Sequence, residues 1–92
     1  MELYKMTLKC ALDGAKISFI FEAIQGVSLE TSIESFLQAV GFCDDFTELS
    51  IKPASVTASQ RYIKAIAIGA SVFDASSYAL GKITMADIKA GL

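Results

Sequence analysis

Residues 3–24 read LYKMTLKCALDGAKISFIFEAI, and this stretch decides the fold. In its first half the even-numbered positions are apolar, and in its second half the odd-numbered positions are apolar. Alternation with a period of two is typical of β-strands that have one buried face. Between the halves lies Asp13-Gly14, a pair that tolerates the two positive φ angles of a type I′ turn. The sequence therefore predicts a β-hairpin.

A two-residue turn also predicts the register of this hairpin. It places Leu12 opposite Ala15 and Met6 opposite Phe21, so that the apolar residues of both strands share one face. A slip of one residue would turn every apolar side chain to the other face. Turn chemistry and alternation thus agree on one apolar face.

The other face of the hairpin combines charge with apolar side chains. Lys5 is expected opposite Glu22, an ion pair worth about a few tenths of a kcal/mol. Leu3, Ile20 and Ile24 lie on the same face, where contact with water alone would not favour them. We expect this face to be covered either by later parts of the chain or by a partner.

A helix is predicted over residues 29–41, which carry five apolar side chains at helical spacing. Ser28 and Thr31 are alternative N-caps. Gly41 suits the left-handed position that follows a helix end. The apolar stripe should pack against the apolar face of the hairpin and form a ββα unit.

A third strand is predicted over residues 46–52, with Leu49 and Ile51 facing inward. Pro53 cannot donate a ladder hydrogen bond, which places this strand at an edge or a bend of the sheet.

Residues 61–73 fit two structures. Several apolar residues follow a helical spacing, but the segment is rich in β-branched and aromatic residues, which favour strands. Gly69 weakens a helix more than it weakens a strand with a bulge. We favour a strand here and keep the helix as the alternative.

The predicted fold is a single α+β domain over residues 1–92. An N-terminal hairpin and an amphipathic helix (ββα) are followed by two further strands and a short C-terminal helix, with the helix on one face of an antiparallel sheet. The last helix is predicted from Thr84 and Asp87, which match a capping box, and residues 75–80 form a short helix or a turn.

Composition restricts the classes of partner. The chain has a net charge of −2 and no basic cluster in sequence, so we expect no nucleic acid as a partner. No apolar run is long enough to span a bilayer, and we expect no membrane contact. Cys10 and Cys43 form no CxxC pair, which favours reduced thiols and a cytoplasmic location, with a disulfide as the alternative. Apolar residues make up 53% of the chain against an average of roughly 45–50%; either alanine inflates this fraction or an interface between chains is buried.

The residue types exclude several kinds of catalysis. Histidine is absent from the sequence, which removes the commonest general base and any Ser-His-Asp or Cys-His nucleophile within one chain. The acidic group Asp44, Asp45 and Glu48 is expected to be a solvated turn instead of a metal site. We therefore expect no enzyme activity, no catalytic residues, no cofactor and no metal.

The favoured function is a non-catalytic protein–protein interaction or assembly protein, a class common among small phage and mobile-element proteins. Its partner is another protein or further copies of the chain, bound through a strand edge near Pro53 or through the N-terminal strand. The candidate interface residues are apolar, aromatic or arginine side chains: Leu3, Ile20, Ile24, Arg61, Tyr62 and Tyr78.

Two alternatives remain open. One is a module that binds a small apolar ligand between sheet and helix, with the candidate lining residues Tyr4, Phe19, Phe21 and Phe36. The other is an enzyme with a site shared between subunits, with the candidate residues Tyr62, Lys64 and Asp74.

Overall fold

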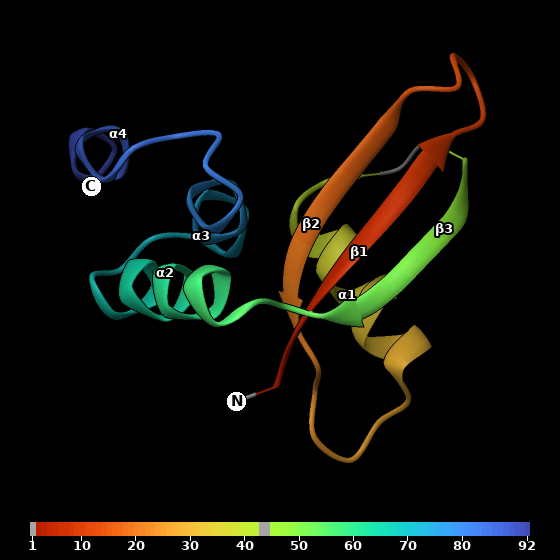
Figure 1. Ribbon diagram of the computed structural model, residues 1–92, viewed down its shortest axis with the longest axis horizontal. Coiled ribbons are helices and arrows are strands. Elements are labelled where there is room, and N and C mark those ends of the chain that lie inside the picture. Colours follow the sequence, from red (N-terminus) through yellow and green to blue (C-terminus); the bar gives the residue numbers. More distant parts are fainter. Residues whose placement is uncertain (1, 43–44) are drawn as a thin grey trace.

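A three-stranded antiparallel sheet and four helices form the part of the chain described by the computed structural model, residues 2–42 and 45–92 (Figure 1). The elements follow the order β1 (Leu3–Cys10), β2 (Lys16–Glu22), α1 (Leu29–Ala39), β3 (Phe46–Pro53), α2 (Val56–Ala67), α3 (Val72–Ala79) and α4 (Met85–Ala90). The strand order is β2-β1-β3, so β1 is central. The helix α1 lies on one face of the sheet, and α2, α3 and α4 gather beside β2 (Figure 1).

The hairpin forms as predicted, but its register differs by two residues. Met6 lies opposite Phe19 instead of Phe21, and Lys5 does not lie opposite Glu22. A shift of two residues in the register leaves every paired side chain on its predicted face, because alternate residues of a strand share a face. The apolar face is therefore confirmed, whereas the predicted direct opposition of Lys5 and Glu22 is wrong.

The loop of the hairpin explains the difference, because it contains four residues, 11–14, instead of two. The backbone N–H of Cys10 donates to the carbonyl of Ala15 at 2.9 Å, and that of Gly14 donates to the carbonyl of Cys10 at 2.9 Å. Gly14 has a φ of +72°, but none of the described non-glycine residues has a positive φ. The predicted type I′ turn, which requires two positive φ angles, is therefore wrong. Leu12, predicted to face inward, lies at the loop tip and is 96% exposed.

The helix α1 covers the apolar face of the hairpin, as predicted. Ser28 is its N-cap, because the Ser28 Oγ accepts from the backbone N–H of Thr31 at 3.2 Å. At the other end the N–H of Phe42 donates to the carbonyl of Leu37 at 2.9 Å around Gly41, which has a φ of +74°. The buried side chains between sheet and helix are Met6, Leu8, Phe19, Phe21, Ile33, Phe36 and Leu37.

Residues 61–73, predicted to be a strand, form the larger part of α2 and the start of α3. The helix α2 starts earlier than the predicted strand, because the Ser55 Oγ accepts from the N–H of Ala58 at 3.1 Å and caps it. Tyr62 and Ala65, three residues apart, are both buried. Burial of one helical face outweighs the strand propensity of the individual side chains.

Gly69 ends α2, whereas the strand prediction treated it as an interior residue. It has a φ of +97°, and the next N–H, that of Ala70, donates to the carbonyl of Ala65 at 3.0 Å. This is the Schellman arrangement, which favours glycine. Serine N-caps and glycine ends bracket three helices in this way, in the pairs Ser28 and Gly41, Ser55 and Gly69, and Ser71 and Gly81.

The helix α4 begins at the predicted capping box. The backbone N–H of Thr84 donates to the Asp87 carboxylate at 2.8 Å, and the N–H of Asp87 donates to the Thr84 hydroxyl at 3.2 Å. The Thr84 hydroxyl also donates to the Asp87 carboxylate at 3.0 Å. The hydrogen bond from the Thr84 backbone and, after it, the one from the Thr84 hydroxyl lower the pKa of the Asp87 carboxyl.

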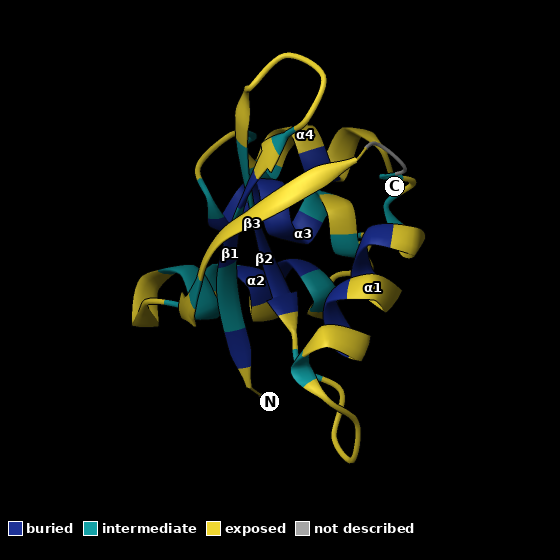
Figure 2. Cartoon of the chain, turned by 90° about the vertical axis from the view of Figure 1, so that its right-hand side faces the viewer, coloured by how far each residue is buried: buried dark blue, intermediate teal, exposed yellow. Residues whose placement is uncertain are grey.

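A second core covers part of the opposite face of the sheet. Leu3 and Ile20 lie in it together with residues of the last three helices, Tyr62, Ala65, Ala75, Tyr78, Ala79 and Ile88. Later parts of the chain thus cover these two apolar residues of the hairpin, which is one of the two explanations expected from the sequence. In Figure 2 dark blue, buried segments are visible in β1 and β2.

The third strand forms as predicted and lies at an edge of the sheet. Thr7 pairs with Ser50 and the next residue, Leu8, pairs with Glu48, so Leu49 is an extra residue in a β-bulge. Leu49 was predicted to face inward, but the bulge leaves it 45% exposed. Ile51, also predicted inward, is half-buried against the α1 core.

A buried hydrogen bond joins α3 to β2. The substitution Ser76→Ala tests how much this bond contributes to stability. The backbone N–H of Ile20 donates to the Ser76 Oγ at 2.9 Å. Removal of the hydroxyl leaves a buried donor unsatisfied, so we expect the free energy of unfolding to fall by about 1–3 kcal/mol in urea denaturation. The control Ser35→Ala, on the exposed side of α1, should change it by less than about 0.5 kcal/mol. Equal effects of the two substitutions would contradict the role of this bond.

Candidate functional site

The two edges of the sheet differ in how they are covered. At the β2 edge, the Ser76 Oγ accepts the N–H of Ile20, and the Lys82 Nζ donates to the carbonyl of Ser18 at 3.5 Å. At the β3 edge, no other element of the described ranges 2–42 and 45–92 forms a hydrogen bond with the outer side of the strand. A strand edge without partners can pair with a strand of another chain.

The backbone of β3 alternates between the two sides of the strand. Just beyond its end, the N–H of Ala54 donates to the carbonyl of Leu3 at 2.9 Å, toward β1. By the alternation of an antiparallel ladder, Ile51 directs its N–H and C=O away from β1. Pro53 also lies on this outer side and has no N–H to offer. The outer side therefore offers the N–H and C=O of Ile51, whereas Pro53 offers a C=O alone.

Apolar side chains accompany this free edge. Phe46 is 39% exposed and Leu49 is 45% exposed, and Ile51 is half-buried. The ring of Phe46 lies against that of Phe42, with 5.8 Å between the ring centroids. In Figure 2 nearly the whole of β3 is coloured as exposed. We call the strand with Phe46, Leu49 and Ile51 the β3 edge, and it joins free backbone groups to exposed apolar side chains.

The candidate interface residues predicted from the sequence lie mostly inside the chain. Leu3, Ile20, Tyr62 and Tyr78 are buried in the second core. Arg61 is half-buried; its guanidinium stacks on the Tyr78 ring at 4.8 Å and donates to the Tyr78 carbonyl at 3.4 Å. Ile24 is exposed and lies apart from them, after β2. A contact of any of the six with another chain stays a prediction.

The β3 edge contains a predicted strand but none of these six residues. Two sequence signals point to it: Pro53, which indicates an edge, and the serine and glycine residues that bracket α2. These brackets assign residues 55–69 to a helix and so leave β3 as the last strand of the sheet.

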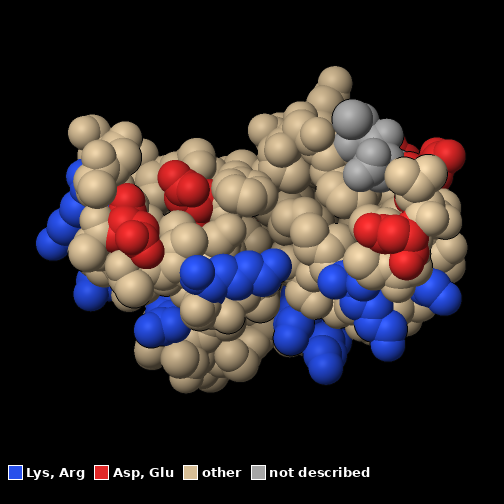
Figure 3. Space-filling view, turned by 90° about the horizontal axis from the view of Figure 1, so that it is seen from above, with Lys and Arg blue, Asp and Glu red and all other residues tan. Residues whose placement is uncertain are grey.

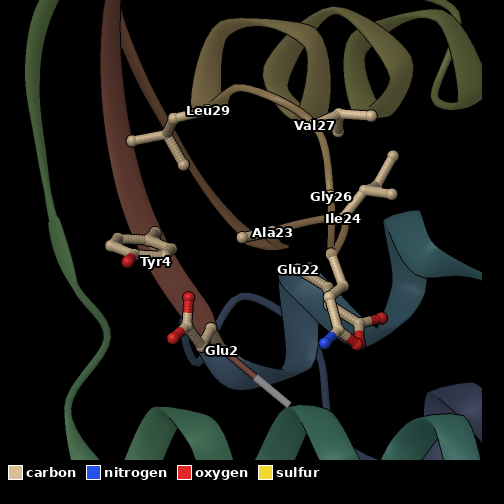
Figure 4. A pocket seen from close by; sticks show the side chains of 9 residues that line it. Glu2, Tyr4, Glu22, Ala23, Ile24, Gly26, Val27 and Leu29 are labelled. Carbon is tan, nitrogen blue, oxygen red and sulfur yellow. The ribbon is translucent and has the colours of Figure 1, made fainter.

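An open cavity of about 820 Å³ lies where β1 begins and β2 ends (Figure 4). Tyr4 and Leu29 form part of its apolar lining, and the carboxylates of Glu2 and Glu22 are nearby; the remaining lining residues are Ala23, Ile24, Gln25, Gly26 and Val27. In Figure 4 Tyr4 and Glu2 lie on the β1 side and Ile24 and Val27 on the opposite side.

This cavity is not the ligand site predicted from the sequence. Of the four candidate lining residues, Tyr4 alone lines it. The rings of Phe19 and Phe21 both pack against that of Phe36, at centroid distances of 5.4 and 6.2 Å. These three side chains fill the core between sheet and α1. Binding of a small ligand stays a hypothesis.

The three candidate residues for an active site shared between subunits differ in how far they are buried. Tyr62 is buried and Lys64 is exposed, as expected for positions two residues apart on a helix. Asp74 is half-buried in the first turn of α3. A second chain would have to complete any such site.

The acidic segment after α1 is described only in part. Asp45 and Glu48 are exposed, whereas Cys43 and Asp44 lie outside the described residues. Within residues 2–42 and 45–92, no three His, Cys, Asp or Glu side chains are placed to hold a metal ion together. In the same ranges, no helix has the length and apolar character needed to cross a membrane.

No family model, curated protein or solved structure matches this chain. The proposals below therefore rest on the geometry of the described residues.

Tyr62 is a titratable group whose pKa is shifted by the fold. Burial raises the pKa of its phenol above the ordinary value of 10.0, and the negative charge of Glu22 raises it further. The folded state therefore holds the phenol proton more tightly than the unfolded state does. The corresponding stability is present below pH 10 and is lost as the pH rises through the folded pKa.

We expect the free energy of unfolding to fall above about pH 10, and the Tyr62→Phe variant to lose the part of this fall that comes from Tyr62. Urea denaturation of both proteins from neutral to alkaline pH measures the difference. The control Tyr4→Phe retains Tyr62 and should keep the fall. An unchanged alkaline profile in Tyr62→Phe would show that Tyr62 titrates alike in both states.

Proposed function

We propose that this chain is a non-catalytic protein–protein interaction or assembly protein that associates with a second copy of itself through the β3 edge. The observation that carries the proposal is the contrast between the two sheet edges. Side chains of Ser76 and Lys82 occupy the β2 edge, while the β3 edge has free backbone groups beside exposed Phe46 and Leu49.

A second copy fits this edge because an antiparallel strand pair is its own complement. Two β3 strands related by a two-fold axis run antiparallel and offer each other the same groups. Their pairing joins two three-stranded sheets into one six-stranded sheet, as in other cases of strand addition. The apolar side chains of the β3 edge then lose contact with water.

The covered β2 edge limits the size of the assembly. Each copy has one free edge among its described strands, so pairing of β3 with β3 consumes both free edges and closes the assembly. An open sheet edge on both sides would instead allow copies to add without limit. The expected product is a dimer.

The test is the mass in solution by light scattering after size exclusion, over a range of concentrations. We expect a dimer for the unchanged chain. Leu49→Lys places a charge on the β3 edge, and we expect it to weaken the dimer by about tenfold or more, since tenfold in Kd corresponds to about 1.4 kcal/mol.

The matched control is Leu12→Lys, because Leu12 is also an exposed leucine but lies at the tip of the hairpin loop. It adds the same charge away from β3 and should leave the dimer unchanged. Circular dichroism and urea denaturation establish that both variants are folded. A monomer at every concentration, or equal weakening by the two substitutions, would refute pairing through β3.

A further inference from the structure

The face of the sheet opposite α1 carries an unusual set of like charges. Lys5 and Lys9 of β1, Lys16 of β2 and Lys52 of β3 lie on this face by the register of the strands. One carboxylate, that of Glu22 opposite Leu3, lies at the end of the same face. We call these four side chains the lysine face. Half of the eight Lys and Arg residues thus lie on one face of a chain whose net charge is −2.

The register places the four lysines in two directly opposed pairs. Lys5 lies opposite Lys52, and Lys9 lies opposite Lys16. Like charges that face each other across two strands destabilise a sheet. A solvated sheet face is more stable when charges of both signs alternate. The arrangement therefore opposes folding, and a bound anion would offset the repulsion.

Hydroxyl groups occupy the space between the two lysine pairs. Thr7 and Ser18 lie opposite each other with their hydroxyl oxygens 3.0 Å apart, and Ser50 lies opposite Thr7 on the other side. Lys82 approaches from beyond the β2 edge, where its Nζ donates to the carbonyl of Ser18.

The space-filling view in Figure 3 also shows an uneven distribution of charge. In Figure 3 several of the blue Lys and Arg side chains gather along the lower side of the molecule, and the red Asp and Glu side chains lie above them. The basic surface is therefore local, although the whole chain is acidic.

We propose that the lysine face binds an acidic segment of a partner polypeptide in an extended conformation. Ammonium groups attract carboxylates without requiring a fixed geometry, and the hydroxyl groups can donate hydrogen bonds to them. The two pairs are four residues apart along β1, which is about 13 Å at 3.3 Å per residue. An extended segment with acidic residues about four positions apart matches both pairs.

The chemistry of this face favours a polypeptide over a nucleic acid. Single-stranded nucleic acids bind sheets through aromatic side chains that stack on bases. The lysine face and its hydroxyl residues include no aromatic side chain. The acidic balance of the chain also differs from the strongly basic domains that bind phosphate backbones.

This inference goes beyond the pairing of β3 and does not depend on it. A two-fold axis through paired β3 edges runs perpendicular to the sheet, so both lysine faces stay open on the same side of a dimer. A monomer exposes the lysine face equally.

The experiment measures binding of a short, fluorescently labelled oligoglutamate by anisotropy at low salt. We expect binding by the unchanged chain, and a loss of about tenfold or more in affinity for the Lys5→Gln/Lys52→Gln variant. Added salt should weaken binding, because it screens exposed charges. Urea denaturation of this variant should show no loss of stability, since a repulsive pair has been removed.

The matched control is Lys64→Gln/Lys89→Gln, in which two exposed lysines of α2 and α4 are neutralised. It changes the net charge by the same amount and should keep the affinity. Absence of oligoglutamate binding, or an equal loss in both variants, would overturn the proposal. Tighter binding of a single-stranded oligonucleotide of equal charge would overturn it in favour of nucleic acid. Light scattering on the same samples reports separately on the pairing of β3.

Discussion

One buried hydrogen bond connects the two halves of the molecule, between the backbone N–H of Ile20 and the hydroxyl of Ser76. It occupies a donor that β2, an edge strand, would otherwise leave unpaired. It also fixes α3 against the sheet, within the second core that Ile20 shares with residues of α2 and α3. A polar bond inside an apolar layer specifies position, because a displaced helix would leave the donor unsatisfied. The difference between the two sheet edges depends on this contact. The β2 edge is covered by α3, whereas the β3 edge stays without a hydrogen-bonding partner among the described residues.

The two faces of the sheet also differ in how far the chain covers them. One face is closed by α1 and a cluster of aromatic rings. The other face is covered at one end by the second core and carries lysine and hydroxyl side chains over the rest. The second core accounts for Leu3 and Ile20, two of the three apolar residues predicted on the outer face of the hairpin, whereas Ile24 stays exposed. The β3 edge and the lysine face are two of the surfaces that folding leaves exposed, and both proposals concern them.

Local signals in the sequence predicted the hairpin, α1, β3 and α4, because each depends on residues that are close in sequence. Alternation predicted which side chains are buried, even though the register differed, since a difference of two preserves the faces. The turn was mispredicted because Asp13-Gly14 permits two positive φ angles but does not require them, and only Gly14 adopts one. The segment 61–73 was mispredicted because strand propensity was weighed without the caps at Ser55 and Gly69.

The candidate surfaces were harder to predict than the elements. Pro53 indicated an edge strand, but exposure of Leu49 depends on a bulge opposite Thr7 and Leu8 that no local pattern reveals. The lysine face was not predicted, because Lys5 and Lys52 become neighbours only through the pairing of β1 with β3. Residues far apart in sequence form it, so a search for a basic cluster along the chain finds none.

The central position of β1 has a consequence for the order of events during synthesis. Its partner β2 follows after a four-residue loop, but its partner β3 begins only at Phe46. The hairpin and α1 can therefore form while β1 still presents an unpaired edge to its surroundings. A growing chain is open to wrong strand pairing during this interval, since long-range strand contacts form late and exposed edges promote aggregation. Arrival of β3 ends this exposure and transfers the free edge from the first strand of the chain to the last.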